Sequence, residues 1–232
     1  MPIVLFDVDS TLLTTGGAGK SALMRSLAQA YHPVEPPPGY SLAGKTDPAV
    51  LSEVLAAAGV KDGRVQELVE RALQVYPAIL EEELAQAGTT QPCPGVPVLL
   101  AALSQMPEIE LGLFTGNLRV GTLTKLRAAG LDGFAWRWFA CGDGLPDKTQ
   151  VLARGLAEMR AERPGLDAGQ VLVVGDAEGD VRGGKLHGAR VLGTATGALT
   201  PAELLALGAD HAVKDLSDTA GLVRWILSAS TR

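Results

Sequence analysis

Three short apolar segments end in clusters of polar residues, and this feature constrains the fold more than any other. The segments are residues 3–6, 111–114 and 171–174. Continuous apolar runs of this length are typical of strands buried on both faces, as in a parallel sheet. The carboxyl ends of parallel strands lie at one edge, and ligands of open α/β sheets bind there. We therefore expect the three polar clusters to meet in one crevice.

Strands and helices alternate through most of the chain. Apolar residues at three- and four-residue spacing predict helices at 96–104, 118–129, 149–162, 181–186, 201–207 and 220–227. Between them lie strand-like runs at 109–114, 134–140, 171–174, 190–193 and 211–213. This alternation predicts an α/β fold with a doubly wound, Rossmann-like parallel sheet.

The segment 16–92 has a different character. Its periodicity predicts helices at 21–31, 47–58 and 62–86, separated by a proline-rich loop. Asp47 and Pro48 are typical of an N-cap followed by proline at the first helical position. We predict a core domain of residues 1–15 and 93–232, with residues 16–92 inserted as a helical domain.

Composition and charge exclude several classes of protein. The 232 residues carry a net charge of −6, which argues against binding nucleic acid through a basic surface. No apolar run approaches the ~18 residues of a membrane-spanning helix. The first residues lack the basic region of a signal peptide, so we expect a cytoplasmic protein. Cys93 and Cys141 are too few for a disulfide framework or a zinc site, and we expect both to be buried.

The polar clusters contain four carboxylates that would converge in the crevice. Asp7 and Asp9 follow the first strand, residues 115–117 (Thr-Gly-Asn) follow the second, and Asp176 and Asp180 follow the third. Like charges this close repel by ~4 kcal/mol per pair at an effective dielectric constant of 20. One such aspartate could simply cap a helix, but acids at strand ends in register require a cation. Their oxygen ligands favour Mg²⁺.

These residues resemble the motifs of the haloacid dehalogenase superfamily. Residues 7–12, Asp-Val-Asp-Ser-Thr-Leu, resemble its first motif, D-x-D-x-T-L, and Thr115 and Lys148 resemble its second and third. Gly175-Asp176 followed by Asp180 resembles the fourth, G-D-x-x-x-D. The helical insert resembles the first class of cap domain in this superfamily. The whole chain is most similar to the phosphoglycolate-phosphatase-like branch.

The resemblance implies hydrolysis of a phosphate ester. Asp7 would attack phosphorus and form an aspartyl phosphate, and Asp9 would act as general acid and base. The dehalogenases of the superfamily lack an acid at the position of Asp9, so its presence favours phosphoryl transfer. Mg²⁺ would bind the Asp7 carboxylate, the main-chain carbonyl of Asp9 and Asp176.

Other residues are expected to hold the phosphoryl group. By resemblance, Thr115 and the backbone N–H groups of Gly116 and Asn117 would contact its oxygens. Lys148 would offset negative charge there, and Asp180 would orient Lys148 or a metal-bound water. The expected ligand is therefore a small-molecule phosphate ester.

The insert is expected to select the substrate. It leaves the core near residues 14–17 and returns near 92–95, both suited to hinging. Closure would bring the loop 44–47 over the crevice, where Lys45 could meet a substrate carboxylate, as in phosphoglycolate. A solvent-exposed lysine beside an N-cap is the alternative interpretation.

Other functions remain open at this point. A phosphomutase or a phosphonate hydrolase of the same superfamily would share most of these residues, and Lys45 could form the Schiff base of the latter. A phospho-accepting receiver domain also gathers Asp, Thr and Lys at strand ends. However, the phosphorylated aspartate of a receiver follows a strand in the middle of the chain and not the first strand. A receiver domain is also about half as long as this chain. A catalytically silent binding protein would not need the complete set of acids.

Overall fold

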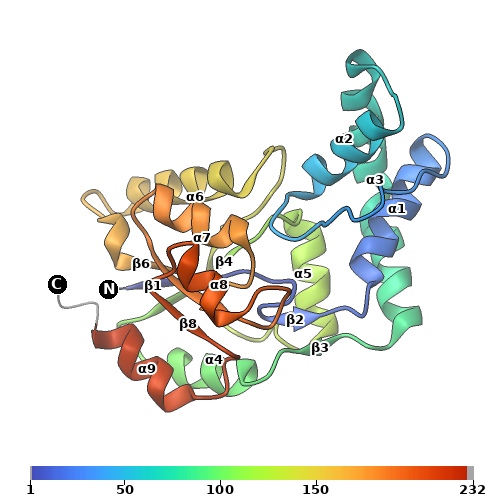
Figure 1. Cartoon of the computed structure of the whole chain (residues 1–232). Helices are drawn as coiled ribbons and strands as arrows, with labels where there is room; N and C mark the ends of the chain where they lie inside the picture. The colour runs from blue at the N-terminus through green and yellow to red at the C-terminus, as the bar shows by residue number, and fades with distance from the viewer. Residues whose placement is uncertain (1, 229–232) are drawn as a thin grey trace.

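A six-stranded parallel sheet forms the centre of the computed structural model, which describes residues 2–228 (Figure 1). Its strand order is β5-β4-β1-β6-β7-β8, and every neighbouring pair is parallel. The strands are β1 (Ile3–Phe6), β4 (Glu110–Phe114), β5 (Trp136–Ala140), β6 (Val171–Gly175), β7 (Arg190–Thr194) and β8 (His211–Val213). The predicted doubly wound α/β sheet is confirmed, and the three strands followed by polar clusters lie next to one another at its centre.

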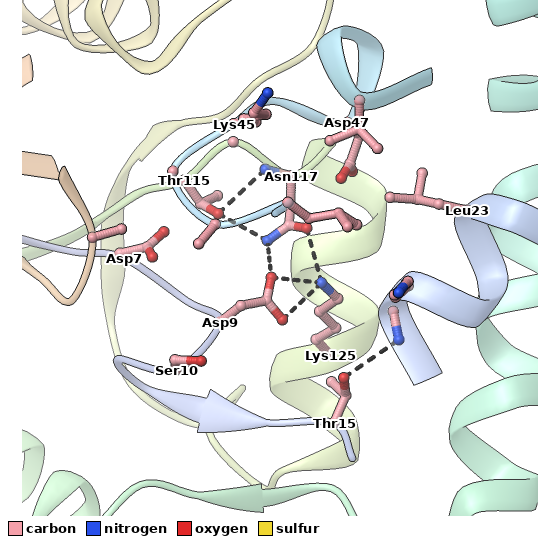
Figure 2. A pocket seen from close by; sticks show the side chains of 18 of the residues that line it. Asp7, Asp9, Ser10, Thr15, Leu23, Lys45, Asp47, Thr115, Asn117 and Lys125 are labelled. Atoms are coloured by element: carbon pink, nitrogen blue, oxygen red, sulfur yellow. Dashed lines mark hydrogen bonds and ion pairs between the residues drawn. The ribbon is translucent and has the colours of Figure 1, made fainter. Parts of the chain in front are cut away.

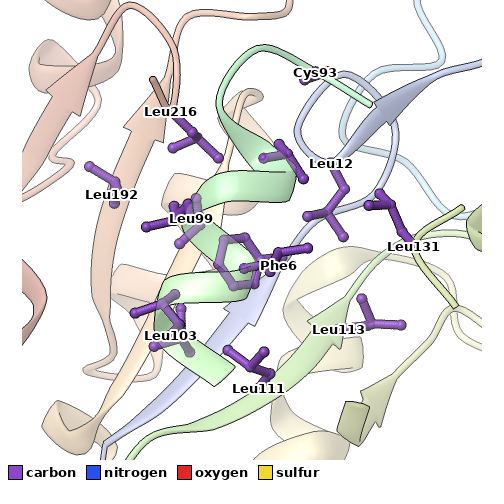
Figure 3. Close-up of a cluster of buried hydrophobic side chains, with 14 of the residues drawn as sticks. Phe6, Leu12, Cys93, Leu99, Leu103, Leu111, Leu113, Leu131, Leu192 and Leu216 are labelled. Carbon is purple, nitrogen blue, oxygen red and sulfur yellow. The ribbon is translucent and has the colours of Figure 1, made fainter. Parts of the chain in front are cut away.

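Helices cover both faces of this sheet because alternate side chains of each strand point to opposite sides. Val4 and Phe6 of β1 join one apolar cluster with α4 (Val96–Ser104), α5 (Arg119–Ala128) and α9 (Thr219–Ser228) (Figure 3). Ile3 and Leu5 join the cluster on the other face. That face is covered by α6 (Lys148–Glu162), α7 (Glu178–Leu186) and α8 (Pro201–Ala206). A short 3₁₀ turn, Ala168–Gln170, leads into β6.

Three further helices pack together beside the sheet and form a helical lobe, residues 18–87 (Figure 1). They are α1 (Ala18–Ala30), α2 (Asp47–Ala57) and α3 (Asp62–Ala87). The lobe has an apolar cluster of its own, which includes the fully buried Leu27, Leu51 and Tyr76. Gly88 ends α3 with a φ of 58°, a left-handed conformation that glycine adopts without strain.

A short antiparallel ribbon connects the lobe to the sheet. It pairs β2 (Leu13–Thr14) with β3 (Gln91–Pro92). The sequence analysis missed both strands, because two residues are too few to show an alternating pattern. The two segments expected to act as hinges, residues 14–17 and 92–95, therefore each begin at the last residue of a strand of this ribbon.

Several helix starts also differ from the sequence predictions. The N-cap of α2 is Thr46, whose side chain accepts a hydrogen bond from the backbone N–H of Ala49 at 3.3 Å, so the prediction of Asp47 as N-cap is wrong. Both α1 and α7 begin three residues before their predicted starts. Their first turns contain glycine and charged residues, which carry no apolar periodicity. None of the described helices is both long enough and apolar enough to cross a membrane.

Candidate active site

The polar clusters after β1, β4 and β6 line one cavity of about 430 Å³. Figure 2 shows the side chains that follow β1 and β4, among them Asp9 and Asn117. The register places Phe6 beside both Leu113 and Val174, so the residues that follow the three strands emerge at the same level. The backbone N–H of Asp7 donates to the carbonyl of Val174 at 2.8 Å, which extends the pairing into the site. The sequence-predicted residues that line the cavity are Asp7, Asp9, Lys45, Thr115, Gly116, Asn117, Lys148 and Asp176.

Lys148 links two of the predicted acids. Its ammonium nitrogen lies 2.8 Å from Oδ1 of Asp7 and 2.6 Å from Oδ1 of Asp180, and all three side chains are buried. The other carboxylate oxygen of Asp180 accepts the backbone N–H of Ala177 at 3.0 Å. Burial alone would lower the pKa of Lys148, but the charges of Asp180 and Asp7 raise it above its usual value. Lys148 therefore stays charged beside Asp7, as the resemblance implied.

Negative charge exceeds positive charge on this side of the cavity. Carboxylate oxygens of Asp7, Asp176 and Asp180 lie within 4.8 Å of one another. Burial, together with repulsion between the acids, raises the pKa of Asp7 to about 7 and that of Asp176 to about 8. The cluster is thus short of compensating positive charge.

The cluster fits a divalent cation with oxygen ligands. The hydroxyl of Thr11 donates to Oδ1 of Asp176 at 3.0 Å and so orients this carboxylate. Within residues 2–228, Oδ2 of Asp7 and Oδ2 of Asp176 have no hydrogen-bond partner. Both oxygens of Asp180 are engaged by Lys148 and Ala177. Asp7 and Asp176 are therefore the carboxylates available to Mg²⁺, whereas Asp180 is placed to hold Lys148.

Asp9 lies on the other side of the cavity and has different partners. Both of its carboxylate oxygens contact the ammonium of Lys125, at 2.9 and 2.7 Å, and Oδ2 also accepts from the amide of Asn117 at 2.6 Å (Figure 2). Burial would raise the pKa of Asp9, but Lys125 and Asn117 lower it below its ordinary value. The sequence analysis missed Lys125. The signal that could have found it is a lysine on the buried face of α5, where its neighbours are Thr122 and Leu126.

Thr115 and Gly116 form the wall between these two groups of side chains. The hydroxyl oxygen of Thr115 accepts from the backbone N–H of Asn117 at 3.3 Å and from its side-chain amide at 2.9 Å. Gly116 lies against the loop before α2, where a Cβ atom would come within 1.9 Å of the carbonyl oxygen of Lys45. Only glycine permits this approach.

The loop before α2 lines the cavity and contacts the loops that follow β4 and β5. The backbone N–H of Asp47 donates to the carbonyl of Gly116 at 2.9 Å, and the hydroxyl of Thr46 donates to the carbonyl of Leu145 at 2.8 Å. The carboxylate of Asp47 accepts the backbone N–H of Leu118 at 2.9 Å. Burial raises the pKa of Asp47 to about 6. These docking contacts of Thr46 and Asp47 were not foreseen, because they depend on loops remote in the sequence.

Lys45 lines the cavity but is already paired. Its ammonium forms an ion pair with Glu53 of α2 and lies 4.5 Å from the ring centroid of Tyr40. The side chain is 33% exposed, so it is neither fully solvated nor buried. A substrate anion would have to compete with Glu53 for Lys45.

Comparisons with known proteins identify the family of this chain. A model of the haloacid dehalogenase-like hydrolase family matches residues 1–188. No curated protein matches the chain.

Solved structures share the fold over nearly the full length. A hydrolase from Pseudomonas syringae is 19% identical, with a TM-score of 0.70 over 97% of this chain and 99% of that one. CbbY from Rhodobacter sphaeroides, solved in complex with phosphate, is 19% identical with a TM-score of 0.66 over 94% and 96% of the two chains. A predicted phosphoglycolate phosphatase from Haemophilus somnus 129pt is 18% identical with a TM-score of 0.66 over 96% and 98%. These likenesses concern the fold, and the match of the family model over residues 1–188 shows that the chain belongs to the haloacid dehalogenase-like hydrolase family.

Proposed function

We propose that this protein is a Mg²⁺-dependent phosphatase that hydrolyses a small phosphomonoester through an aspartyl phosphate on Asp7. The observation that carries the proposal is the position of Asp7 at the end of the central strand β1. There it lies against Lys148 and within reach of Asp176, while Asp9 lies two residues further on. The phosphate bound to the structural neighbour CbbY supports a phosphoryl ligand.

In the first step, a carboxylate oxygen of Asp7 attacks phosphorus and the bond from phosphorus to the ester oxygen breaks. Asp9, which carries the proton that it took from water in the preceding turnover, gives this proton to the departing oxygen as a general acid. Lys148, the hydroxyl of Thr115 and the backbone N–H groups of Gly116 and Asn117 hold the phosphoryl oxygens.

In the second step, Asp9 takes a proton from a water molecule that attacks the phosphorus of the aspartyl phosphate. The bond from phosphorus to Asp7 then breaks, which releases inorganic phosphate and restores the carboxylate. Asp180 keeps Lys148 against Asp7 throughout, since it accepts from this ammonium at 2.6 Å.

The free carboxylate oxygens of Asp7 and Asp176 and the main-chain carbonyl of Asp9 would hold Mg²⁺. When bound, it offsets charge on the phosphoryl group and the surrounding acids.

The helical lobe acts in this proposal as a cap over the site. We assign residues 16–92 to the cap and residues 1–15 and 93–232 to the catalytic core. The loop 44–47 covers the cavity, and Lys45 contributes to recognition of an acidic substrate. A compound with a carboxylate near its phosphate, such as phosphoglycolate, would match this arrangement. The predicted phosphoglycolate phosphatase among the structural neighbours supports this choice.

A screen of small phosphomonoesters with and without Mg²⁺ tests the proposal. We expect inorganic phosphate to be released from at least one ester, activity to be lost in excess chelator, and activity to return with Mg²⁺. The Asp176→Asn variant serves as the matched control, since it should need far more Mg²⁺ for the same rate. Full turnover in excess chelator would contradict the metal assignment. Transfer of phosphate between two positions of a sugar, without release, would identify a phosphomutase instead.

A further inference from the structure

A second buried lysine lies in the cavity, and the mechanism above does not use it. Lys125 comes from α5 and is 3% exposed. Its ammonium lies 2.9 and 2.7 Å from the two carboxylate oxygens of Asp9 and 2.8 Å from the amide oxygen of Asn117. An ammonium has three protons, and here three acceptors surround it. No proton of Lys125 is left for a substrate.

Asp9, Asn117 and Lys125 form a closed ring of hydrogen bonds (Figure 2). Because Lys125 donates to the oxygen of the Asn117 amide, the amide nitrogen faces Asp9 and Thr115, at 2.6 and 2.9 Å. The ring fixes the carboxylate of Asp9 from two directions, although this side chain is 43% exposed to the cavity. A group that is so accessible would otherwise sample several rotamers.

Fold stability alone is a poor reason for this lysine. Taking an ammonium out of water is costly, and apolar side chains of similar volume often stabilise a protein as well as a buried ion pair or better. The position of Lys125 on α5 lies between the buried Thr122 and Leu126, where a methionine would pack without this cost.

We propose that Lys125 is a positioning residue for Asp9 in the phosphatase reaction. It holds the carboxylate where Asp9 can protonate the leaving oxygen in the first step and accept a proton from water in the second. This inference rests on the proposed function and adds a residue to it.

The two steps differ in their need for Asp9, and this difference makes the proposal testable. p-Nitrophenolate is a stable leaving group, so the phosphorus–oxygen bond of p-nitrophenyl phosphate breaks with little help from an acid. The attack of water on the aspartyl phosphate still needs the base. Without Lys125 the second step therefore slows more than the first, and the aspartyl phosphate accumulates.

The experiment is rapid-quench kinetics of the Mg²⁺-loaded Lys125→Met variant with p-nitrophenyl phosphate. We expect kcat to fall roughly 10- to 100-fold, a part of the range that general acid–base catalysis contributes. We also expect a burst of about one p-nitrophenol per active site before the slow steady state. The Kd of inorganic phosphate, measured by calorimetry, should stay within about twofold, because the variant replaces none of the residues that hold the phosphoryl oxygens.

Gly19 offers a second variant that keeps the charge of Lys125. A Cβ atom at Gly19 of α1 would lie 3.1 Å from the ammonium nitrogen of Lys125 and 3.3 Å from its Cε, so alanine there presses on this side chain. Alanine favours a helix over glycine, and Gly19→Ala should therefore fold with an unchanged or higher Tm. We expect the same burst with a smaller loss of kcat, about two- to tenfold. The exposed Arg127→Met on the same helix is the matched control and should leave kcat unchanged.

The outcomes separate the two proposals. A wild-type protein that releases no p-nitrophenol with Mg²⁺ and forms no phosphoenzyme overturns the proposed function and the role of Lys125 with it. If the wild type is active, either of two results for the variant overturns the role of Lys125 and leaves the proposed function intact. In the first, Lys125→Met keeps its kcat. In the second, it loses turnover and phosphate binding together without a burst, as a misfolded site would.

Discussion

The two sides of the cavity balance their charges in opposite ways. On the side of α6 and α7, Asp7, Asp176 and Asp180 share one lysine, Lys148, and the pKa values of Asp7 and Asp176 are raised. On the side of α5, Lys125 and the amide of Asn117 both donate to a single carboxylate, that of Asp9, and its pKa is lowered.

This difference shows which side needs a partner from outside the chain. Buried carboxylates with raised pKa values gain most from a divalent cation, whereas a carboxylate already paired gains little. In the proposed mechanism, the nucleophile Asp7 and the carboxylate that would bind the metal with it lie on one side of the cavity, and the acid–base group Asp9 lies on the other. The variants below test whether the two sides are as distinct in chemistry as they are in charge.

The largest effect is expected from Asp7→Asn on the acid-rich side. An amide cannot form the acyl phosphate, so turnover should fall below detection. The variant removes a repelling carboxylate and should remain folded, which a thermal melt will check. Rates near those of the wild type would show that the covalent mechanism is wrong.

Asp9→Asn on the opposite side should be less severe. We expect a loss of about 10²- to 10⁴-fold in kcat, the usual scale of general acid–base catalysis. Phosphoenzyme should still form from p-nitrophenyl phosphate, and acid-quenched gels with a labelled phosphoryl group would detect it. A loss as complete as that of Asp7→Asn, with no phosphoenzyme, would mean that the two sides do not separate in function.

Lys45→Ala tests the lobe that covers both sides. For the best acidic substrate, we expect kcat/KM to fall roughly ten- to a hundredfold, or ~1.4–2.7 kcal/mol, because a desolvated charge pair under a closed lid is lost. Hydrolysis of p-nitrophenyl phosphate should change little, since this substrate has no carboxylate. Glu53→Gln is the matched variant: it releases Lys45 from its ion pair and should preserve or improve kcat/KM for the acidic substrate. Equal losses on both substrates for Lys45→Ala would assign Lys45 to the chemistry or the fold.

The smallest effect concerns stability against pH in the metal-free protein. Asp7 and Asp176 have pKa values of about 7 and 8 in the folded state, well above their unfolded value near 3.8. Between the unfolded and the folded pKa values, the folded state binds more protons than the unfolded state. The free energy of unfolding should therefore decrease as pH rises from about 4 to 8. Urea denaturation in chelator across this range measures the slope. Asp176→Asn should flatten it, and a slope of the opposite sign would contradict the raised pKa values.

The residues of the acid-rich side could be brought together from the sequence because their positions follow from local pattern. Buried strands can be recognised from their apolar runs, and parallel strands bring their carboxyl ends together. Asp7, Thr115 and Asp176 therefore could be placed together from the sequence. The contacts of Lys148 with Asp7 and Asp180 agree with the family resemblance.

The other side of the cavity was decided by tertiary structure. Lys125 acquires its role only because α5 packs between the sheet and the lobe, which brings its ammonium to Asp9. Thr46 and Asp47 contact the loops around Gly116, Leu118 and Leu145, far away in the chain.

Local periodicity determines which segments form strands and helices, and the end of a strand fixes where its next residues emerge. By itself, the sequence therefore determined the α/β sheet, the helical insert and the acids at the centre of the site. It could not determine which side chain neutralises Asp9, or that Lys45 is held by Glu53. Those contacts depend on the angles and distances at which the helices pack, and packing is set by the whole apolar core rather than by any local pattern.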